Sequence, residues 1–286
     1  MAAGGLVLRG RDRLQGRPFL LMGIVNVTPD SFSDGGRFLD PAAAVAHGIS
    51  LAAAGADILD LGAESSRPGS HPVPAEEELR RLLPVVRGLR EALPGVPLSV
   101  DTTKAAVAEA ALDHGADMVN DISAGTFDPA MVPLCARRGV PLVLMHMRGT
   151  PTTMQEAPYY RDPVAEVRGE LEARLRAAEA AGLGPGTLVL DPGIGFGKRP
   201  GDNLALLQNL PALASLGYPL LVGVSRKSLV GALTGAPVED RLPGSLAFHV
   251  AALLGGARIF RVHDLAAHHQ ALACASSLLP FRAFSP

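Results

Sequence analysis

One stretch of the sequence decides the fold: Met22-Gly23-Ile24-Val25-Asn26-Val27-Thr28-Pro29-Asp30-Ser31-Phe32-Ser33-Asp34-Gly35-Gly36. An apolar run over residues 19–27 predicts a buried strand, and at Asn26 this strand gives way to a polar loop that ends in glycines. Taken alone, Asn26 could equally cap a turn, with Asp30 and Asp34 as ordinary loop acids. The same pattern of an apolar strand with a polar end recurs seven more times along the chain, and this recurrence favours a functional site.

The rest of the chain alternates short apolar runs with Ala-rich or charged helical segments. The expected strands are residues 19–27, 57–62, 97–101, 117–121, 141–145, 187–190, 219–224 and 258–262. The expected helices are residues 41–54, 75–93, 104–114, 129–138, 163–181, 202–210, a divided pair at 228–233 and 243–254, and 264–278. Each strand must return through a helical crossover, so the alternation predicts a parallel sheet. Eight such units predict a (β/α)8 TIM barrel, with an open doubly wound sheet as the alternative.

Length and composition fit one domain over residues 1–286, in which residues 1–17 are an N-terminal extension with a predicted hairpin around Gly10. Hydrophobic residues make up 48% of the chain, and the net charge of −2 gives no electrostatic reason to expect nucleic acid or an anionic membrane as partner. We find neither a signal peptide nor a membrane-spanning run, and so expect a cytoplasmic protein. Cys135 and Cys274 are expected to be buried thiols without chemistry.

Polar residues gather where the expected strands end. They are Asn26, Asp60, Asp101, Asn120, Asp121, His146, Asp191, Ser225, Arg261 and His263. In a barrel these ends surround one mouth, where polar residues are typical of function. Only three lysines occur, at positions 104, 198 and 227, so the place of each is informative.

Asp101, Asn120 and Asp191 suit a heterocycle that carries several ring N–H and amino donors, because carboxylate and amide oxygens accept such bonds. The alternative for Asp101 is a helix N-cap. The Gly-rich segment 191–198 lacks the spacing of a nucleotide phosphate loop, so its glycines are better explained by close approach to a flat ligand. Phe196 could face that ligand or belong to the core.

Residues 223–228 end the strand at 219–224 and start a helix, and Arg261-Val262-His263 lies in the last strand. Barrels commonly bind phosphate groups after these two strands. A phosphorylated ligand is therefore expected there. The alternative is that Arg226 and Arg261 pair with carboxylates at the rim. The loops at 27–40 and 63–74 are long for this fold and typical of lids, and Asp34 and Arg67 could close over a charged substrate.

With these residues in place, the chain resembles the dihydropteroate synthase family of the folate pathway. The blocks that carry the resemblance are Asn26 to Gly36, Glu64-Ser65-Ser66-Arg67-Pro68-Gly69, Ser99-Val100-Asp101-Thr102, Val119-Asn120-Asp121-Ile122-Ser123, Met145-His146-Met147, Asp191-Pro192-Gly193-Ile194-Gly195-Phe196-Gly197-Lys198, Ser225-Arg226-Lys227-Ser228 and Arg261-Val262-His263-Asp264. Two residues depart from the family pattern: Ala63 replaces a Gly, and Ser66 replaces a Thr while keeping its hydroxyl.

The resemblance implies condensation of a dihydropterin-methyl diphosphate with p-aminobenzoate, assisted by Mg2+, and it suggests a homodimer formed through outer helices. It implies that Asp101, Asn120, Asp191, Met145 and Lys227 hold the pterin. It implies further that Asn26 with Mg2+, Arg261 and His263 hold the diphosphate. The aminobenzoate site would be shaped by Ser66, Arg67, Pro68, Phe196 and Ser228. Lys227, Arg261 and Asp101 would be the catalytic residues.

Two other functions are compatible with a pterin-binding barrel. One is methyl transfer from a folate to a corrinoid, which the block Ser65-Ser66-Arg67-Pro68 disfavours. The other is a non-catalytic pterin-binding homologue that acts through a partner. Asn26 together with Lys227, Arg261 and His263 argues for catalysis, because pterin binding alone needs no diphosphate site.

Overall fold

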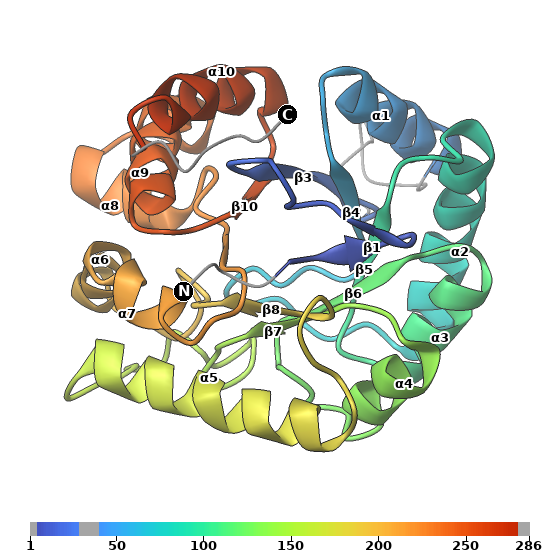
Figure 1. Ribbon diagram of the computed structural model, residues 1–286, viewed down its shortest axis with the longest axis horizontal. Coiled ribbons are helices and arrows are strands. Elements are labelled where there is room, and N and C mark those ends of the chain that lie inside the picture. Colours follow the sequence, from blue (N-terminus) through green and yellow to red (C-terminus); the bar gives the residue numbers. More distant parts are fainter. Residues whose placement is uncertain (1–4, 29–39, 280–286) are drawn as a thin grey trace.

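The computed structural model describes residues 5–28 and 40–279, and these form a barrel of parallel strands ringed by helices (Figure 1). A two-stranded antiparallel hairpin comes first, made of β1 (Val7–Leu8) and β2 (Arg11–Asp12). The barrel strands are β3 (Leu20–Asn26), β4 (Ile58–Gly62), β5 (Leu98–Asp101), β6 (Met118–Asp121), β7 (Leu142–Met145), β8 (Leu188–Asp191), β9 (Leu221–Val222) and β10 (Ile259–Val262).

The strand order is β8-β7-β6-β5-β4-β3-β10-β9, and every neighbouring pair is parallel. A parallel bridge between Leu190 and Leu220 joins the two ends of this order, so the sheet closes on itself. The (β/α)8 barrel predicted from the alternation of strands and helices is confirmed, and the open doubly wound alternative is excluded.

The helices that return the chain between strands cover the outside of the barrel. They are α1 (Pro41–Ala53), α2 (Ala75–Ala92), α3 (Ala105–Asp113), α4 (Met131–Arg138), α5 (Pro163–Ala180), α6 (Pro200–Gln208), α7 (Leu210–Ala214), α8 (Ser228–Thr234), the 3-10 turn η1 (Val238–Asp240), α9 (Leu242–Leu254) and α10 (Leu265–Ser276). Local chemistry starts several of them: Asp40 and Asp162 accept hydrogen bonds from first-turn amides of α1 and α5, and a proline follows each cap.

The hairpin seals the amino-terminal end of the barrel. Its Leu6 and Leu8 are buried in one apolar cluster with Leu14 and with inward-facing strand residues such as Met22 and Ile58. Val7 N donates to Gly186 O just before β8, at 2.8 Å. With one end filled by apolar side chains, the polar strand ends at the opposite mouth are left as the place for a site.

Three sequence-based expectations differ from the structure. The segment expected as one helix over 202–210 is two helices, because Pro211 cannot continue the hydrogen-bond ladder of α6. The strand expected over 219–224 is confined to Leu221–Val222. Of the two cysteines, Cys135 is buried as expected, but Cys274 is exposed on α10.

Two further observations bear on the sequence analysis. The expected roles of Asp30 and Asp34 fall on residues outside those described. Within residues 5–28 and 40–279, no helix is long and apolar enough to cross a membrane.

Candidate active site

A buried network of charged groups crosses the barrel mouth. Arg261 on β10 donates from Nε to Asp60 Oδ2 at 2.6 Å and from Nη2 to Asp101 Oδ2 at 2.8 Å. Asn120 Nδ2 donates to the same Asp60 oxygen at 3.0 Å. Four strands therefore contribute to one network, and β3 lies between β4 and β10.

Burial and neighbouring charges act against each other on the pKa values of Asp101 and Arg261. It raises the pKa of the Asp101 carboxyl above its ordinary value, and the Arg261 charge opposes that shift. Burial lowers the pKa of Arg261, but Asp60 and Asp101 more than offset this, so the pKa lies above its ordinary value. Asp60 is fully buried, and its Oδ1 has no hydrogen-bond partner in the described part of the chain. The network thus holds acceptors that a donor-rich ligand could satisfy.

A second group forms where β8 meets the chain after β9. Asp191 Oδ1 accepts a hydrogen bond from Gly193 N at 2.7 Å, which turns the chain sharply after the strand. The Lys227 ammonium donates to Ile194 O, and its Nζ lies 4.6 Å from the centre of the Phe196 ring. Burial raises the pKa of Asp191 and lowers that of Lys227 to about 8, although each charge favours the other.

A third group lies beside the last strand. The Ser225 hydroxyl is 3.0 Å from His263 Nδ1 and accepts from His263 N at 3.2 Å. Burial, with the charges of Arg261 and Arg226, lowers the pKa of His263 to about 4, so the ring is neutral at neutral pH. Arg226 is held by Asp264, with Nε 2.9 Å from Oδ2. Arg226 therefore pairs with a carboxylate, as the alternative to phosphate binding proposed. Arg261 also pairs with carboxylates, those of Asp60 and Asp101.

The loop at 63–74 is anchored at both its base and its tip. Glu64 Oε2 accepts from Val73 N at 3.0 Å and also from the Lys104 ammonium, which donates to buried Glu78 at 2.7 Å as well. At the tip, Gly69 N donates to Pro151 O at 2.9 Å. The anchors hold the loop across the mouth, and the charge of its Arg67 is near enough to lower the pKa of His263.

The remaining predicted residues take different positions at this mouth. Ser66 and Asp101 line one small pocket, which also includes Glu78. Met145 is buried at the end of β7, whereas Arg67, Pro68 and Ser228 are exposed. Asn26 is half-buried at the end of β3, and the structure gives its side chain no hydrogen-bond partner among the described residues. The same part of the chain holds no group of three or more His, Cys, Asp or Glu side chains arranged for a metal.

Three residues that organise the site were assigned no role in it from the sequence alone. Asp60 was expected at a strand end, but it lies in the middle of β4 and forms the centre of the charge network. Glu78 is one of three acids opening α2, which suit the positive end of the helix, yet it is fully buried against Lys104. Lys198 is also buried. The scarcity of lysine in this chain, which has only three, was the one feature of the sequence that pointed to this residue.

The chain is similar to known proteins over most of its length. The family described as pterin binding enzyme matches residues 22–263. The dihydropteroate synthase of Mycobacterium leprae is 49% identical over 262 residues, which are 89% of this chain and 92% of that protein. Dihydropteroate synthase of Xanthomonas albilineans, solved with 4-aminobenzoic acid, is 47% identical with a TM-score of 0.88 over 98% of this chain and 100% of that one. The same enzyme with 7,8-dihydropteroate gives a TM-score of 0.82 over 92% and 94%.

Proposed function

The chain belongs to the dihydropteroate synthase family of pterin-binding enzymes, and from that membership we infer how its barrel mouth divides the work of the reaction. The reaction joins 6-hydroxymethyl-7,8-dihydropterin diphosphate to p-aminobenzoate and yields 7,8-dihydropteroate and diphosphate, a transfer step of folate biosynthesis. The contacts around Asp60, Lys227 and His263 support separate places at the mouth for the pterin, the diphosphate and the aminobenzoate.

The pterin lies at the acidic side of the mouth in this proposal. Asp101, Asn120 and Asp191 accept from its ring N–H and amino groups, and Met145 and Lys227 complete the pocket. The burial of Asn120, Met145 and Asp191 supports the assignment, because hydrogen bonds to a flat heterocycle in a water-poor pocket discriminate strongly between donors and acceptors. Arg261 already holds Asp101 by a hydrogen bond, which orients that carboxylate before the substrate arrives.

The diphosphate lies toward Arg261 and His263. Arg261 supplies a lasting positive charge. His263, neutral because burial lowers its pKa to about 4, supplies a ring N–H on the nitrogen opposite Ser225. Mg2+ commonly binds through one or two protein oxygens and the oxygens of a phosphorylated substrate. The side-chain oxygen of Asn26, which has no hydrogen-bond partner within residues 5–28 and 40–279, fits this role, and Mg2+ bound there would neutralise charge on the leaving diphosphate.

The aminobenzoate lies under the loop at 63–74 in this proposal. Ser66, Arg67 and Pro68 approach it from that loop, and Phe196 and Ser228 from the opposite side. The exposed Arg67 is available for the carboxylate of p-aminobenzoate, and the Phe196 ring offers a face to its benzene ring.

Departure of diphosphate leaves positive charge on the pterin methylene. Asp101 and Asp191 stabilise this charge while Arg261 stabilises the departing anion, so opposite charges are met at opposite ends of one substrate. The aromatic amine of p-aminobenzoate is weakly basic and attacks in its neutral form, so we assign no general base.

One observation carries the division of roles: the hydrogen-bonded series Asn120, Asp60, Arg261 and Asp101 places acceptors and a cation side by side at one mouth. The test follows diphosphate release and dihydropteroate formation by the purified protein with Mg2+, with and without p-aminobenzoate. We expect dihydropteroate only when both substrates are present. Tight pterin binding without turnover would instead identify a non-catalytic homologue.

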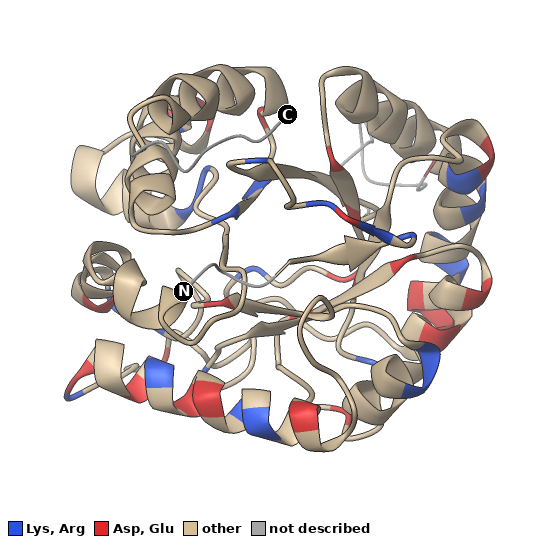
Figure 2. Cartoon of the chain, viewed as in Figure 1, with Lys and Arg blue, Asp and Glu red and all other residues tan. Residues whose placement is uncertain are grey.

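We also propose that the chain forms a homodimer through α9 and α10. Neither helix contains a Lys, Arg, Asp or Glu, in contrast to the charged α5, and Figure 2 shows this difference between the two sides of the barrel. The two helices pack against each other and expose Ala251 and Ala273, and Leu254 at the end of α9 is 50% exposed. An uncharged face with an exposed leucine fits the core of an interface between two copies.

Ala251→Glu and Ala273→Glu should convert the dimer to a monomer in sedimentation velocity, whereas Ala173→Glu on α5 should leave it unchanged. A wild-type monomer at micromolar concentration would overturn the dimer.

A cytoplasmic location is also part of our proposal, and the free thiols of Cys135 and Cys274 are compatible with a reducing compartment.

A further inference from the structure

The loop at residues 192–198 is held by its own Lys198 side chain and by three side chains from other parts of the fold. Each carbonyl from residue 193 to residue 197 accepts a hydrogen bond from a side chain. The donors, in order, are Lys198, Lys227, Gln155, Lys198 and Tyr160. Such complete satisfaction gives the loop one defined conformation although it has no regular structure.

Two glycines press this loop against the chain after β7. Gly193 has a φ of +65°, and a Cβ there would lie 1.9 Å from His146 O. Gly197 has a φ of +61°, and its Cβ would lie 2.4 Å from Arg148 O. The opposite face of the loop meets Lys227, because a Cβ on Gly195 would lie 3.3 Å from the Lys227 Cδ. The face of the loop next to Lys227 therefore belongs to the site. The other face packs against the chain at His146 and Arg148, which supports it from behind.

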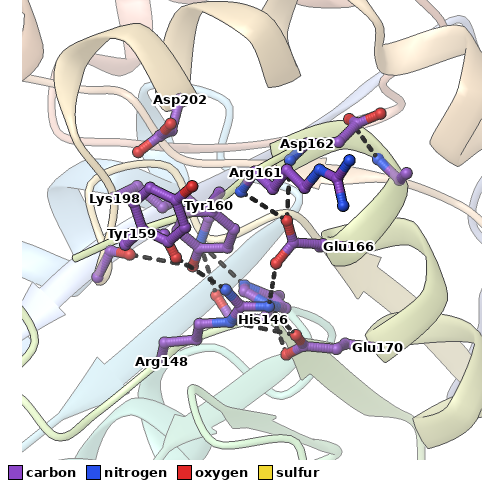
Figure 3. Close-up of polar contacts among 12 residues, drawn as sticks. His146, Arg148, Tyr159, Tyr160, Arg161, Asp162, Glu166, Glu170, Lys198 and Asp202 are labelled. Atoms are coloured by element: carbon purple, nitrogen blue, oxygen red, sulfur yellow. Dashed lines mark hydrogen bonds and ion pairs between the residues drawn. The ribbon is translucent and has the colours of Figure 1, made fainter.

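Lys198 forms that support with His146 and Glu170, and Figure 3 draws all three as sticks. Only 2% of Lys198 is exposed, and its Nζ donates to Gly193 O at 2.9 Å, to Phe196 O at 2.9 Å and to His146 O at 3.1 Å. His146 Nδ1 lies 3.0 Å from the same nitrogen. Burial lowers the pKa of Lys198 to about 7, while the negative charges of Asp191 and Glu170 favour the protonated ammonium.

The surrounding groups fix the proton on His146. Its Nε2 lies 2.9 Å from Glu170 Oε2 on α5, and burial lowers the pKa of the ring, which keeps it neutral. The hydrogen bond from His146, with those from Arg148, lowers the pKa of Glu170 to about 2, so this group is a carboxylate. The His146 proton therefore sits on Nε2, and the lone pair of Nδ1 faces Lys198.

We propose that Lys198, backed by His146 and Glu170, is a positioning residue that holds the 192–198 loop so that Phe196 and Ile194 meet Lys227 at the aminobenzoate end of the site. Lys198 touches no substrate in this arrangement. It acts through Phe196, whose carbonyl it binds and whose ring faces Lys227. The inference rests on the assignment of Phe196 to the aminobenzoate site.

The deciding experiment measures kcat and both KM values for Lys198→Met. Because charged hydrogen bonds to two loop carbonyls are lost, the KM for p-aminobenzoate should rise about tenfold or more, with the KM for the pterin diphosphate changed less than about twofold. Tyr160→Phe is the matched control: it removes one neutral hydrogen bond to the same loop, and its KM values should stay near wild type. Leu134→Ala, on a helix that supplies none of these contacts, controls for lost stability alone.

If Lys198→Met does not fold, Glu170→Gln provides a second test of the positioning role. It removes the charge that fixes the His146 proton, and it should raise the KM for p-aminobenzoate in the same direction by a smaller factor. Equal changes in both KM values, or a lower Tm with wild-type kinetics, would overturn the positioning role. A wild-type protein without turnover would overturn the proposed function instead, which keeps the two failures distinct.

Discussion

Arg261 and Asp60 form the central ion pair of the barrel, with Nε and Oδ2 2.6 Å apart and the Asp60 side chain fully buried. The pair joins β10 to β4 across the intervening β3. The same Arg261 binds Asp101, and the same Asp60 oxygen accepts from Asn120. Asp60 is thus the common anchor of two side chains assigned to the substrate.

Asp60→Asn should be strongly destabilising. It removes one of the two carboxylate charges that compensate the largely buried Arg261 guanidinium, and breaking one partner of a buried pair costs about 3–5 kcal/mol. Urea unfolding of the variant should show this loss. Asp113→Asn, which breaks a solvent-exposed pair with Arg138, should leave the unfolding free energy within error of wild type. Equal effects at the two sites would contradict the anchoring role of Asp60.

Asp101→Asn should weaken pterin binding. One ring donor would meet an amide that pairs with it poorly, which costs about 1–3 kcal/mol, or roughly 5- to 150-fold in Kd. Calorimetric titration with the pterin substrate, on a variant whose circular dichroism matches wild type, measures the change. Unaltered affinity would remove Asp101 from the pterin site.

The Lys227 ammonium should make activity and stability respond to pH in opposite directions. Burial lowers its pKa to about 8, so kcat/KM should fall as the pH rises through 8 and the charge is lost. Between that value and its ordinary pKa near 10.5, the unfolded chain binds more protons at this residue than the folded chain, so its contribution to stability rises with pH. Measurements of kcat/KM and of thermal unfolding over pH 7 to 10 test these two expectations. The Lys227→Met variant should lose activity, and its stability should no longer gain the Lys227 contribution as the pH rises.

Gly193→Ala should damage both fold and activity. The left-handed backbone alone costs an alanine about 1 kcal/mol, and here the new methyl would also collide with His146 O. Gly139→Ala provides the comparison, since its φ is +62° with no atom within 4 Å of the added Cβ. We expect Gly139→Ala to lose only the backbone cost, as measured by thermal unfolding. Similar Tm values for the two variants would show that the loop moves aside freely.

The elements with clear periodicity and caps were predictable from the sequence. Asp40 caps α1 as expected, and the apolar run before Asn26 is β3. Strand 219–224 was shortened by tertiary structure: Val224 N donates to His249 Nε2 at 3.1 Å rather than to a neighbouring strand. A hydrogen bond to a side chain 25 residues away leaves no local trace in the sequence.

The site was predictable as a set of residues but not as a set of contacts. The strand-end pattern identified Asp101, Asn120, Asp191 and Arg261, and the barrel brings them to one mouth. It could not show that Arg261 binds Asp101, since the register of β10 against β3 decides that distance. Nor could it separate buried Glu78 from half-buried Glu77 and exposed Glu76 in the same acidic turn.

The seal at the amino-terminal end of the barrel couples the start of the chain to its finish. Leu6 and Leu8 are synthesised more than 200 residues before Leu221 and Ile259 of the last strands, yet all four side chains lie in one apolar cluster. Arg258 Nε also donates to Pro18 O, at 2.7 Å. These contacts span about the full length of the chain, and contacts so distant in sequence form slowly. We therefore expect the amino-terminal end of the barrel to close late in folding, after the last strand has joined the sheet.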